Sequence, residues 1–477
     1  MLLQIKNKKY TKRKGKLMKK KIISLLLVLV IVLSFASCFK DDIRYNYKDM
    51  SKYLTLPGYA GHVVDLEMDH IQQTIDSYIM QYSTTQAKAI AGANVYVTLK
   101  FTLVEYVDAN QTIDKKGQEI TDLGKKDFYI ENLGNGSYNK TLEDKIIAME
   151  IKYNSSNEVI VELPNEEMFG EYAGKKVYFS CKIDRACVKG DVVKVTYTGY
   201  YMDDNGNIKI NDKGEKDKFD SASDSYFYLG SKLAIDDFEN GIIGMRPGED
   251  NKKEIKATFP EDYANEDLKG KTVIFDITVT AIMEVPEYND KFVKDHLGND
   301  TVEEFEKSLF DYYAENLMNE FLLEKTEFKS YPRREYRDLE DQFDELDIQW
   351  QTYYGMSYET YVKSQYGMTK KEYIQNSMQL EMIYYAIAKA ENITPNKDQL
   401  EDAEEDLIAA YTTEYMNQSK DITEAEARKL AIKYIDQNLG TAVIYEEALV
   451  KLVKDFIGKQ YTVNKIDPTY ESVTVKK

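Results

Sequence analysis

The residue with the most definite chemical prospects is Cys38. An apolar stretch at residues 22–35 precedes it, with three lysines at 19–21 before that stretch and Ala36-Ser37 directly before the cysteine. A charged start, a short apolar core and small residues at the end are the parts of a secretory signal. A signal that ends on cysteine looks like a lipobox, whose thiol becomes diacylated. The pattern predicts a signal peptide over residues 1–37 and an extracytoplasmic chain that is lipid-anchored to the cell membrane through Cys38.

A permanent membrane-spanning helix is the alternative interpretation of the same stretch. The apolar core, residues 22–35, has 14 residues, whereas a helix needs about 20 to cross a bilayer. The length therefore favours a signal peptide.

The charge of the chain excludes one class of partner. The chain of 477 residues has a net charge of −19, and removal of residues 1–37, which hold ten Lys or Arg and no acid, changes it to −29. Neutralisation of phosphates requires a basic footprint, so we expect no nucleic-acid partner. The length is enough for about three domains.

The remaining reactive side chains lack the spacing of a metal or phosphate site. The three histidines, His62, His70 and His296, are scattered rather than paired as ligands. The acidic run at 401–406 is typical of a solvated helix face, and glycine-rich phosphate loops are absent from the sequence. We expect neither a metal nor a cofactor.

Two further cysteines, Cys181 and Cys187, are too few for a disulfide framework. Cys181 alternates with Phe179 in a strand pattern, which favours a small core residue. A bridge between Cys181 and Cys187 is the alternative.

The elements that would position functional residues are suggested by a repeat of 96 residues. The repeated positions are apolar, glycine and glutamate positions: Val97, Leu99 and Phe101 with Val193, Val195 and Tyr197; Gly134 with Gly230; Glu143 with Glu239; Met149 with Met245; and Val177 and Phe179 with Val273 and Phe275. Such a long internal repeat predicts two tandem copies of one domain, over residues 92–186 and 188–284.

Each copy begins and ends with alternating apolar residues, which indicates strands with one buried face. In the second copy, Asp236-Asp237 begins a short helix, because an aspartate cap satisfies free amide donors at a helix N-terminus. The helix should end before Pro247-Gly248. We expect an antiparallel sheet that curves around one short helix.

The second copy carries an ordered series of motifs: Gly190-Asp191, Tyr197-Thr198-Gly199, Phe219-Asp220, Leu229-Gly230-Ser231, Phe238-Glu239, Pro247-Gly248-Glu249, Phe259-Pro260-Glu261-Asp262-Tyr263 and Leu268-Lys269-Gly270-Lys271. Together they resemble an FKBP-type peptidyl-prolyl cis-trans isomerase domain of the trigger-factor kind. The resemblance implies a pocket with Phe238 as its floor and with Ile235 presenting its backbone amide to the substrate carbonyl. The implied pocket residues are Tyr197, Phe219, Asp220, Ile235, Phe238, Tyr263, Leu268 and Phe275.

Aromatic residues suit the implied reaction, which needs no nucleophile. Rotation about an X-Pro bond is opposed by a barrier of about 20 kcal/mol because amide resonance must be broken. Water stabilises the planar amide, so a dry aromatic cup that favours the twisted bond lowers the barrier. Core packing is the alternative role for each aromatic residue.

The sequence departs from the family at one point of the implied pocket. Asp236-Asp237 stands where the family usually has Pro-Gly, between Ile235 and Phe238. Two carboxylates at the mouth should disfavour acidic peptides.

The first copy has different residues at the pocket positions. In the 96-residue register, Asn139 replaces Ile235, Leu142 replaces Phe238 and Glu167 replaces Tyr263, while the core positions Phe101, Gly134, Met149 and Phe179 persist. We therefore expect an FKBP-like domain without isomerase activity at 92–186.

The flanks complete the resemblance. Residues 38–91 are predicted to be an N-terminal linker and helix, with an apolar helical pattern from Ile71 to Tyr82. Within them, residues 53–91 resemble the segment that joins the N-terminal domain of trigger factor to its isomerase domain. Residues 285–477 contain few glycines and prolines, and two capping-box spacings, at 301–304 and 369–372, predict helices. This region resembles the C-terminal chaperone domain of trigger factor, and a helical bundle that merely packs is the alternative.

The sequence thus predicts an α+β chain: two tandem FKBP-like domains followed by an all-α trigger-factor-like C-terminal domain. The predicted function is that of a lipoprotein foldase that isomerises X-Pro bonds and holds unfolded or nascent secreted polypeptides. A non-catalytic holdase with a vestigial isomerase pocket is the alternative. A ligand-binding lipoprotein that feeds a transporter is a third class, but such proteins usually have two α/β lobes, which the repeat disfavours.

Overall fold

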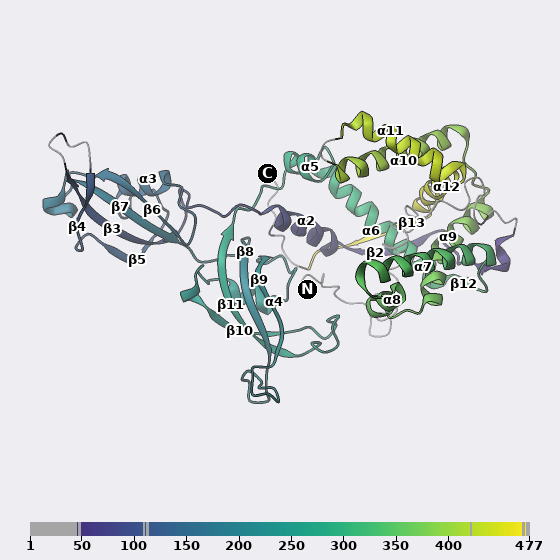
Figure 1. Cartoon of the computed structure of the whole chain (residues 1–477), viewed down its shortest axis with the longest axis horizontal. Helices are drawn as coiled ribbons and strands as arrows, with labels where there is room; N and C mark the ends of the chain where they lie inside the picture. Colours follow the sequence, from purple (N-terminus) through teal and green to yellow (C-terminus); the bar gives the residue numbers. More distant parts are fainter. Residues whose placement is uncertain are drawn as a thin grey trace. The chain divides into compact units, whose positions relative to one another are not determined.

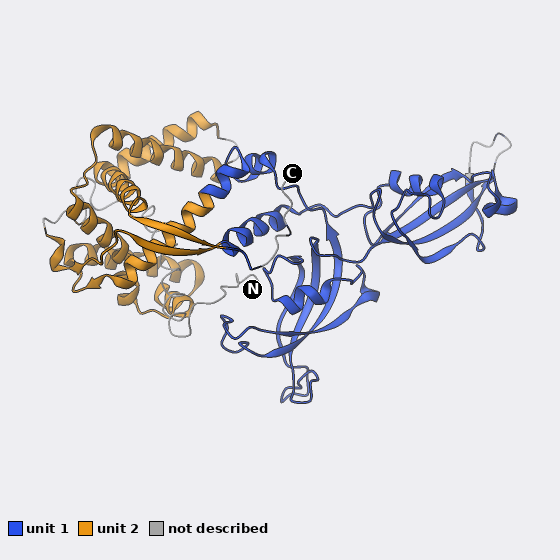
Figure 2. Ribbon diagram, turned by 180° about the vertical axis from the view of Figure 1, so that it is seen from behind, with its two compact units in different colours: residues 1–9, 68–307, 467–477 blue, residues 10–67, 308–466 orange. Residues whose placement is uncertain are grey.

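The computed structural model describes residues 45, 49–107, 110, 114–419, 422–469 and 473. The predicted signal peptide and Cys38 lie outside the described residues. The chain forms two compact units (Figure 2): unit 1 comprises residues 1–9, 68–307 and 467–477, and unit 2 comprises residues 10–67 and 308–466. None of the described helices is both long enough and apolar enough to cross a membrane.

Unit 1 contains two antiparallel sheets that are consecutive in sequence (Figure 1). The first has the order β4-β3-β7-β6, and β5 also pairs with β3; the second has the order β10-β11-β8-β9. The elements of the first are β3 (Val95–Tyr106), β4 (Asp114–Glu119), β5 (Lys125–Ile130), α3 (Lys140–Ala148), β6 (Ser155–Glu162), the 3-10 helix η2 (Glu167–Tyr172) and β7 (Lys176–Asp184). Those of the second are β8 (Val192–Tyr201), β9 (Lys218–Tyr228), α4 (Asp236–Ile242), η3 (Glu249–Asn251), β10 (Lys253–Thr258) and β11 (Thr272–Met283).

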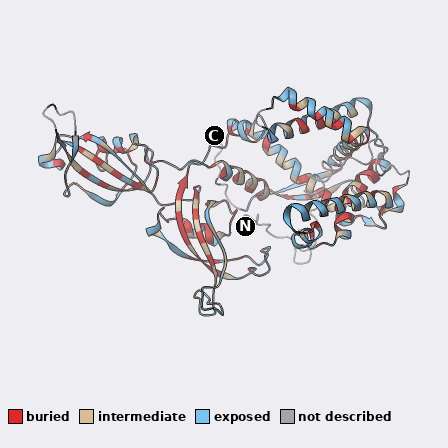
Figure 3. Cartoon of the chain, viewed as in Figure 1, coloured by how far each residue is buried: buried red, intermediate tan, exposed pale blue. Residues whose placement is uncertain are grey.

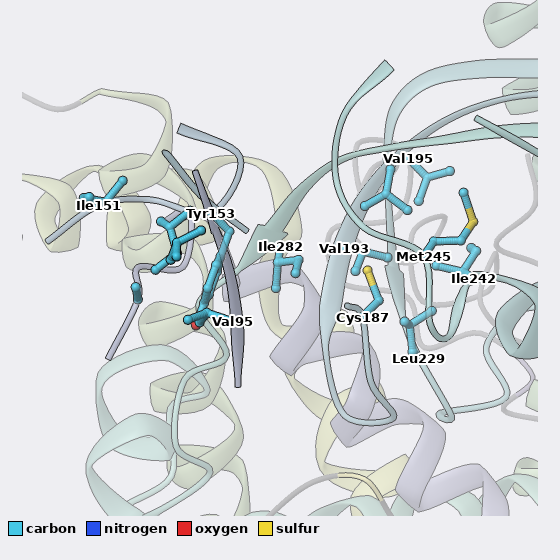
Figure 4. Packing of buried hydrophobic residues seen from close by; sticks show 14 of the residues in the cluster. Val95, Ile151, Tyr153, Cys187, Val193, Val195, Leu229, Ile242, Met245 and Ile282 are labelled. Atoms are coloured by element: carbon cyan, nitrogen blue, oxygen red, sulfur yellow. The ribbon is translucent and has the colours of Figure 1, made fainter. Parts of the chain in front are cut away.

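The helices α2 (Asp69–Tyr82) and α5 (Asp290–His296) flank the two sheets in sequence within unit 1. The strands form because apolar side chains alternate along them. Val193, Val195 and Tyr197 of β8 are buried, whereas the residues between them are half-exposed (Figure 3). The buried faces of the sheets contribute to one apolar cluster, in which Val193, Leu229 and Met245 point toward one another (Figure 4).

The two sheets share a pattern of hydrogen bonds. In both pairs β6–β7 and β10–β11 the register is the same after a shift of 96 residues, so that Val161 pairs with Val177 as Ala257 pairs with Val273. The pairing of the first strand differs: β3 on β7 matches β8 on β11 only after a shift of the first strand by 98 residues. Val97 faces Ile183 in β7, and its equivalent, Val195, faces Val279 in β11.

The register predicted for the first strand is therefore wrong by two residues. The counterpart of Tyr197 is Leu99 rather than Phe101, and the counterpart of Phe101 is Gly199. A strand has a side-chain period of two, so a shift of two residues keeps every apolar residue on the same face. The sequence pattern alone could not distinguish the two registers.

Unit 2 is mainly helical. Its elements are η1 (Met50–Lys52), β1 (Leu54–Thr55), β2 (His62–Glu67), most of α6 (Val302–Lys325), β12 (Glu327–Phe328), α7 (Arg333–Tyr354), α8 (Tyr358–Tyr366), α9 (Lys370–Glu391), α10 (Lys397–Gln418), α11 (Glu424–Tyr434), a π-helix (Ile435–Leu439), α12 (Gly440–Gly458) and β13 (Tyr461–Ile466). The capping box predicted at Thr369 and Glu372 is present, with both reciprocal hydrogen bonds. At the other predicted box, Thr301 accepts from the Glu304 amide, but the Glu304 carboxylate accepts from Asp300 instead.

The units divide the chain differently from the predicted boundaries. Residues 49–67 are part of unit 2, because β1 pairs with β12 and β2 pairs in parallel with β13. Leu54 and Val64 belong to the apolar core of this unit. Helix α5, predicted as the start of the helical domain, is instead part of unit 1.

Candidate functional site

The second sheet and its helix bring most of the implied pocket residues into one aromatic cluster. Tyr197 on β8 lies with its ring centroid 5.7 Å from that of Phe238 on α4 and 5.9 Å from that of Phe275 on β11. Phe238 and Phe275 are themselves 5.0 Å apart, edge to face. Phe219 on β9 completes the group, 5.7 Å from Phe275. Edge-to-face pairs at these separations fix the orientation of the rings.

Helix α4 places Phe238 because a buried glutamate fixes the loop before it. Glu239 accepts backbone hydrogen bonds from Gly230 (2.8 Å), Lys232 (3.2 Å) and Ala234 (2.8 Å). Burial raises the pKa of the Glu239 carboxyl to about 7, although these three amides oppose the shift. The loop and the first turn of α4 are therefore one hydrogen-bonded unit, with Phe238 at 1% exposure.

A polar pair lies at one side of the cluster. The Tyr197 hydroxyl donates to the Asp220 carboxylate over 3.1 Å. Burial, and then Asp220, raise the pKa of Tyr197 well above its ordinary value, so the hydroxyl stays protonated as a donor. Burial and Asp220 also raise the pKa of Tyr263.

The other implied residues lie in the loops around the cluster. Tyr263 is half-buried, with its ring 4.5 Å from that of Phe259. Leu268 is buried in the same apolar cluster. Ile235 is buried directly before α4, and its carbonyl accepts from the Phe238 and Glu239 amides.

The backbone amide of Ile235 has no hydrogen-bond acceptor within the part of the chain that the structure describes. Buried amides are nearly always paired. A free donor beside the aromatic cluster is available to a carbonyl of a bound peptide.

One of the two aspartates at the start of α4, Asp237, has a structural role. The Asp237 carboxylate accepts from the Thr258 amide at the end of β10, over 2.9 Å. This bond ties α4 to the sheet. Asp236 is half-exposed and Asp237 is exposed, so the first turn of α4 presents two carboxylates.

Further aromatic residues contact the cluster and were not predicted. Phe227 lies 4.8 Å from Phe238, and Phe259 lies 6.1 Å from Phe219. Phe259 stands within a quoted motif, and its position directly before Pro260 and close to Tyr263 is the signal that could have identified it. Phe227 is one of two buried residues at the end of a long strand and carries no such signal.

The first sheet has the same loop but no equivalent cup. Glu143 accepts from Gly134 (2.7 Å) and Tyr138 (2.7 Å), as Glu239 does in the second sheet. Glu143 also accepts from the amide of Asn139, over 3.2 Å, so the amide that is free at Ile235 is paired here.

The predicted replacements in the first sheet lie as follows. Leu142 is fully buried, and the side-chain amide of Asn139 donates to Glu166 over 2.9 Å. Glu167 is exposed. Phe101, which occupies the position of Gly199, packs its ring 5.1 Å from that of Phe179.

The described residues contain no group of three or more His, Cys, Asp or Glu side chains that could hold a metal ion. Cys181 and Cys187 are free and buried, and burial raises the pKa of each thiol to about 12. Cys181 is a core residue, as its strand pattern indicated. The cluster on the second sheet thus offers aromatic surface, one carboxylate and one free amide, which suits binding and desolvation of a peptide.

Comparison with known proteins shows which family the second sheet and its helix resemble. Residues 184–280 match the FKBP-type peptidyl-prolyl cis-trans isomerase family. A trigger factor from Caldicellulosiruptor saccharolyticus is 27% identical over 442 residues, which cover 86% of this chain and 92% of that protein. A trigger factor from Francisella tularensis subsp. novicida is 35% identical over 172 residues, 35% of each chain.

A solved structure from work on promiscuous substrate recognition by the trigger factor chaperone covers 63% of this chain and 79% of that chain, at 15% identity. Its TM-score of 0.19 is too low to bear on the arrangement. The second sheet with α4 is an FKBP-type peptidyl-prolyl isomerase domain, and the chain is a trigger-factor-like peptidyl-prolyl isomerase.

Proposed function

We propose that this peptidyl-prolyl isomerase is an extracytoplasmic, lipid-anchored foldase that acts on unfolded or nascent secreted polypeptides. The observation that supports the catalytic part is the packing of Tyr197, Phe219, Phe238 and Phe275 in one aromatic cluster, beside the free amide of Ile235; we propose that this cluster forms the substrate cup. The lipobox-like end of the N-terminal signal at Cys38 supports the location.

In this proposal, catalysis depends on the exclusion of water from the X-Pro amide. The proline ring of the substrate enters the aromatic cup, and the Ile235 amide donates to a substrate carbonyl. Water stabilises the planar, resonance-stabilised amide more than the twisted one, so removal of water favours the twisted state. Because the gain is larger in the transition state than in the ground state, it lowers the barrier rather than only tightening binding.

The Tyr197 and Asp220 pair has a positioning part in this proposal. Its hydrogen bond fixes the Tyr197 ring against Phe238. The acidic mouth formed by Asp236 and Asp237 disfavours acidic peptides, since like charges repel at short range.

The first sheet is proposed to be a copy of the isomerase domain without activity. The shared glutamate-held loop, at Glu143 and Glu239, supports a common origin. Its paired Asn139 amide and the ring of Phe101 at the Gly199 position support the loss of the cup. Helical unit 2 is proposed to hold clients, by its likeness to trigger factor.

The test uses the chain without residues 1–37 and a short Ala-Leu-Pro-Phe peptide. Accelerated cis-to-trans conversion is expected, and a rate equal to that in buffer, from folded protein, would favour a holdase with a vestigial pocket instead. Location is tested separately by expression of the full chain in a bacterium and by mass spectrometry of the membrane fraction. Diacylglycerol on Cys38 is expected, and an unmodified Cys38 in a soluble fraction would exclude the lipid anchor.

A further inference from the structure

The N-terminal end of the described chain is fixed in unit 2. Tyr45 is 1% exposed, its amide donates to the Glu335 carboxylate over 3.2 Å, and its ring centroid lies 5.3 Å from that of Tyr385. Six residues lie between Cys38 and Tyr45, so the seven Cα-to-Cα steps of an extended chain span at most about 25 Å. A lipid on Cys38 would therefore keep this part of unit 2 close to a bilayer. This inference rests on the proposed lipid anchor.

The surface around this point is built from two segments that lie side by side. Strand β1 pairs with β12, and the chain after β12 continues along the segment before β1. The Lys329 ammonium donates to the Ser51 carbonyl over 3.0 Å, and the Ser330 hydroxyl donates to the Lys52 carbonyl over 3.3 Å. Helix α7 then begins at Arg333, and the carboxylate of its third residue, Glu335, accepts the hydrogen bond from the Tyr45 amide.

Several basic residues stand at the start of helix α7 in an acidic protein. The chain has eight arginines and a net charge of −19, and three of the arginines stand in the first five residues of α7. Arg333 and Arg337 are exposed and four residues apart, so they lie on the same side of the helix. Neither forms an ion pair with another described residue.

We define the basic patch as Lys52, Lys329, Arg333 and Arg337, all of which are exposed. Arg334, between the last two, is turned toward Glu335, 3.6 Å away. Asp49 lies within electrostatic reach of the two lysines, and its carboxylate accepts hydrogen bonds from the Ser51 amide and hydroxyl. The pKa of Asp49 is lowered by these bonds and, to a smaller degree, by Lys52 and Lys329.

We propose that the basic patch docks on an anionic lipid surface, so that the N-terminal end of α7 faces the membrane to which the chain is tethered. Basic side chains within a Debye length of an anionic leaflet are attracted to its headgroups. The short tether supplies a high effective concentration, so even a modest attraction sets the orientation.

The experiment replaces the lipid by a tether that does not depend on cellular processing. The chain from residue 39, which retains every described contact, carries an N-terminal histidine tag and is bound to vesicles with a nickel-chelating lipid. The vesicles contain phosphatidylcholine alone or with phosphatidylglycerol. Acetylation rates of Lys52 and Lys329 are measured by mass spectrometry, with Lys397 of α10 as the reference.

Slower acetylation of both lysines on the anionic vesicles, reversed by salt and absent at Lys397, is expected. Each basic side chain near an anionic surface contributes roughly a fivefold preference, so Arg333→Gln with Arg337→Gln should reduce the docked population about 30-fold. The matched control is Lys429→Gln with Lys433→Gln, which removes two exposed cations at the same spacing on α11 and should leave the protection unchanged.

Equal acetylation rates on neutral and anionic vesicles, or equal protection in the two double variants, would overturn the proposal. These outcomes are independent of the lipid on Cys38, since the tag supplies the tether. Failure of lipidation in cells is seen only in the mass of the membrane-extracted chain, and so the two failures are distinguishable.

Discussion

Gly199 of β8 lies so close to Phe219 that a Cβ atom on the glycine would stand 2.6 Å from Cζ of the ring. The same Cβ would stand 2.9 Å from Cε1 of Phe275. The absence of a side chain at this position is therefore what allows the two rings to approach each other across the strand. In the first sheet Phe101 stands at the equivalent position and packs against Phe179.

Gly199→Ala is expected to displace Phe219 and lower the isomerase activity of the chain. The backbone of Gly199 does not need glycine for its own conformation, so the effect should come from the rings alone. Rates on a proline-containing peptide are measured together with near-UV circular dichroism. Gly458→Ala, where an added Cβ meets no atom within 4 Å, is the control and should change neither. Full activity of Gly199→Ala would mean that Phe219 is not part of the cup.

Phe238→Ala should remove most of the activity of the intact chain, because the proposed cup has this ring as its floor. The truncation also leaves a cavity and is expected to cost about 3–5 kcal/mol of stability. Phe238→Leu keeps more of the apolar volume, so its loss of stability should be smaller while its activity remains low. Since the first sheet has no equivalent aromatic cluster, residues 92–186 expressed alone should give a rate equal to that in buffer. A clear rate from this fragment would assign activity to residues 92–186.

The extent to which the sequence predicted this site depended on how local its signals were. The turn residues around α4, including Glu239 and Pro247-Gly248, lie close together in the chain, and the helix was expected where it forms. The expected aspartate cap was wrong, because Ile235 is the N-cap and no side chain caps the helix. The place of Phe227 in the cluster was not predicted, because it depends on how β9 and α4 pack against each other. The strand register of the first sheet was missed by two residues, since a period-two pattern is unchanged by that shift.

The stability of the isomerase domain should fall as the pH rises from about 4.5 through 7. The folded pKa of Glu239, about 7, exceeds its ordinary value of 4.5 because burial disfavours the charged form. Its contribution is therefore fully present below about pH 4.5 and is lost as the pH rises through 7, by about 3 kcal/mol in all.

Glu239→Gln has no titrating group at this position and should lack this pH dependence. It is less stable at low pH, because a side-chain amide nitrogen cannot accept from the backbone. The difference in stability between the two proteins should narrow between pH 5 and 8. Hydrogen exchange of the Gly230, Lys232 and Ala234 amides, corrected for intrinsic rates, measures it. A constant difference would mean that Glu239 is ionised throughout this range.

The partnership between β2 and β13 is the part of the fold that sequence reasoning could least foresee, because it joins segments about four hundred residues apart, such as Val64 and Val463. It implies that helical unit 2 depends on residues 49–67. Val64→Ala is expected to destabilise unit 2 by about 2 kcal/mol, since Val64 is 4% exposed and loses its burial. Val63→Ala on the same strand, at 53% exposure, is the matched control and should cost little.

The single tryptophan, Trp350 of α7, lies in unit 2 and so reports on that unit alone during urea unfolding. In Val64→Ala its transition should move to lower urea with an unchanged slope, whereas the peptide isomerase activity of unit 1 in the absence of urea should be unaffected. The same reasoning predicts that residues 285–477 alone lack a partner for β13 and fail to show the native Trp350 transition, until residues 45–67 are added. If that fragment unfolds cooperatively at the same urea concentration as the intact chain, the N-terminal strands do not stabilise unit 2. The proposed tether at Tyr45 would then be attached to a segment that the core of unit 2 does not need.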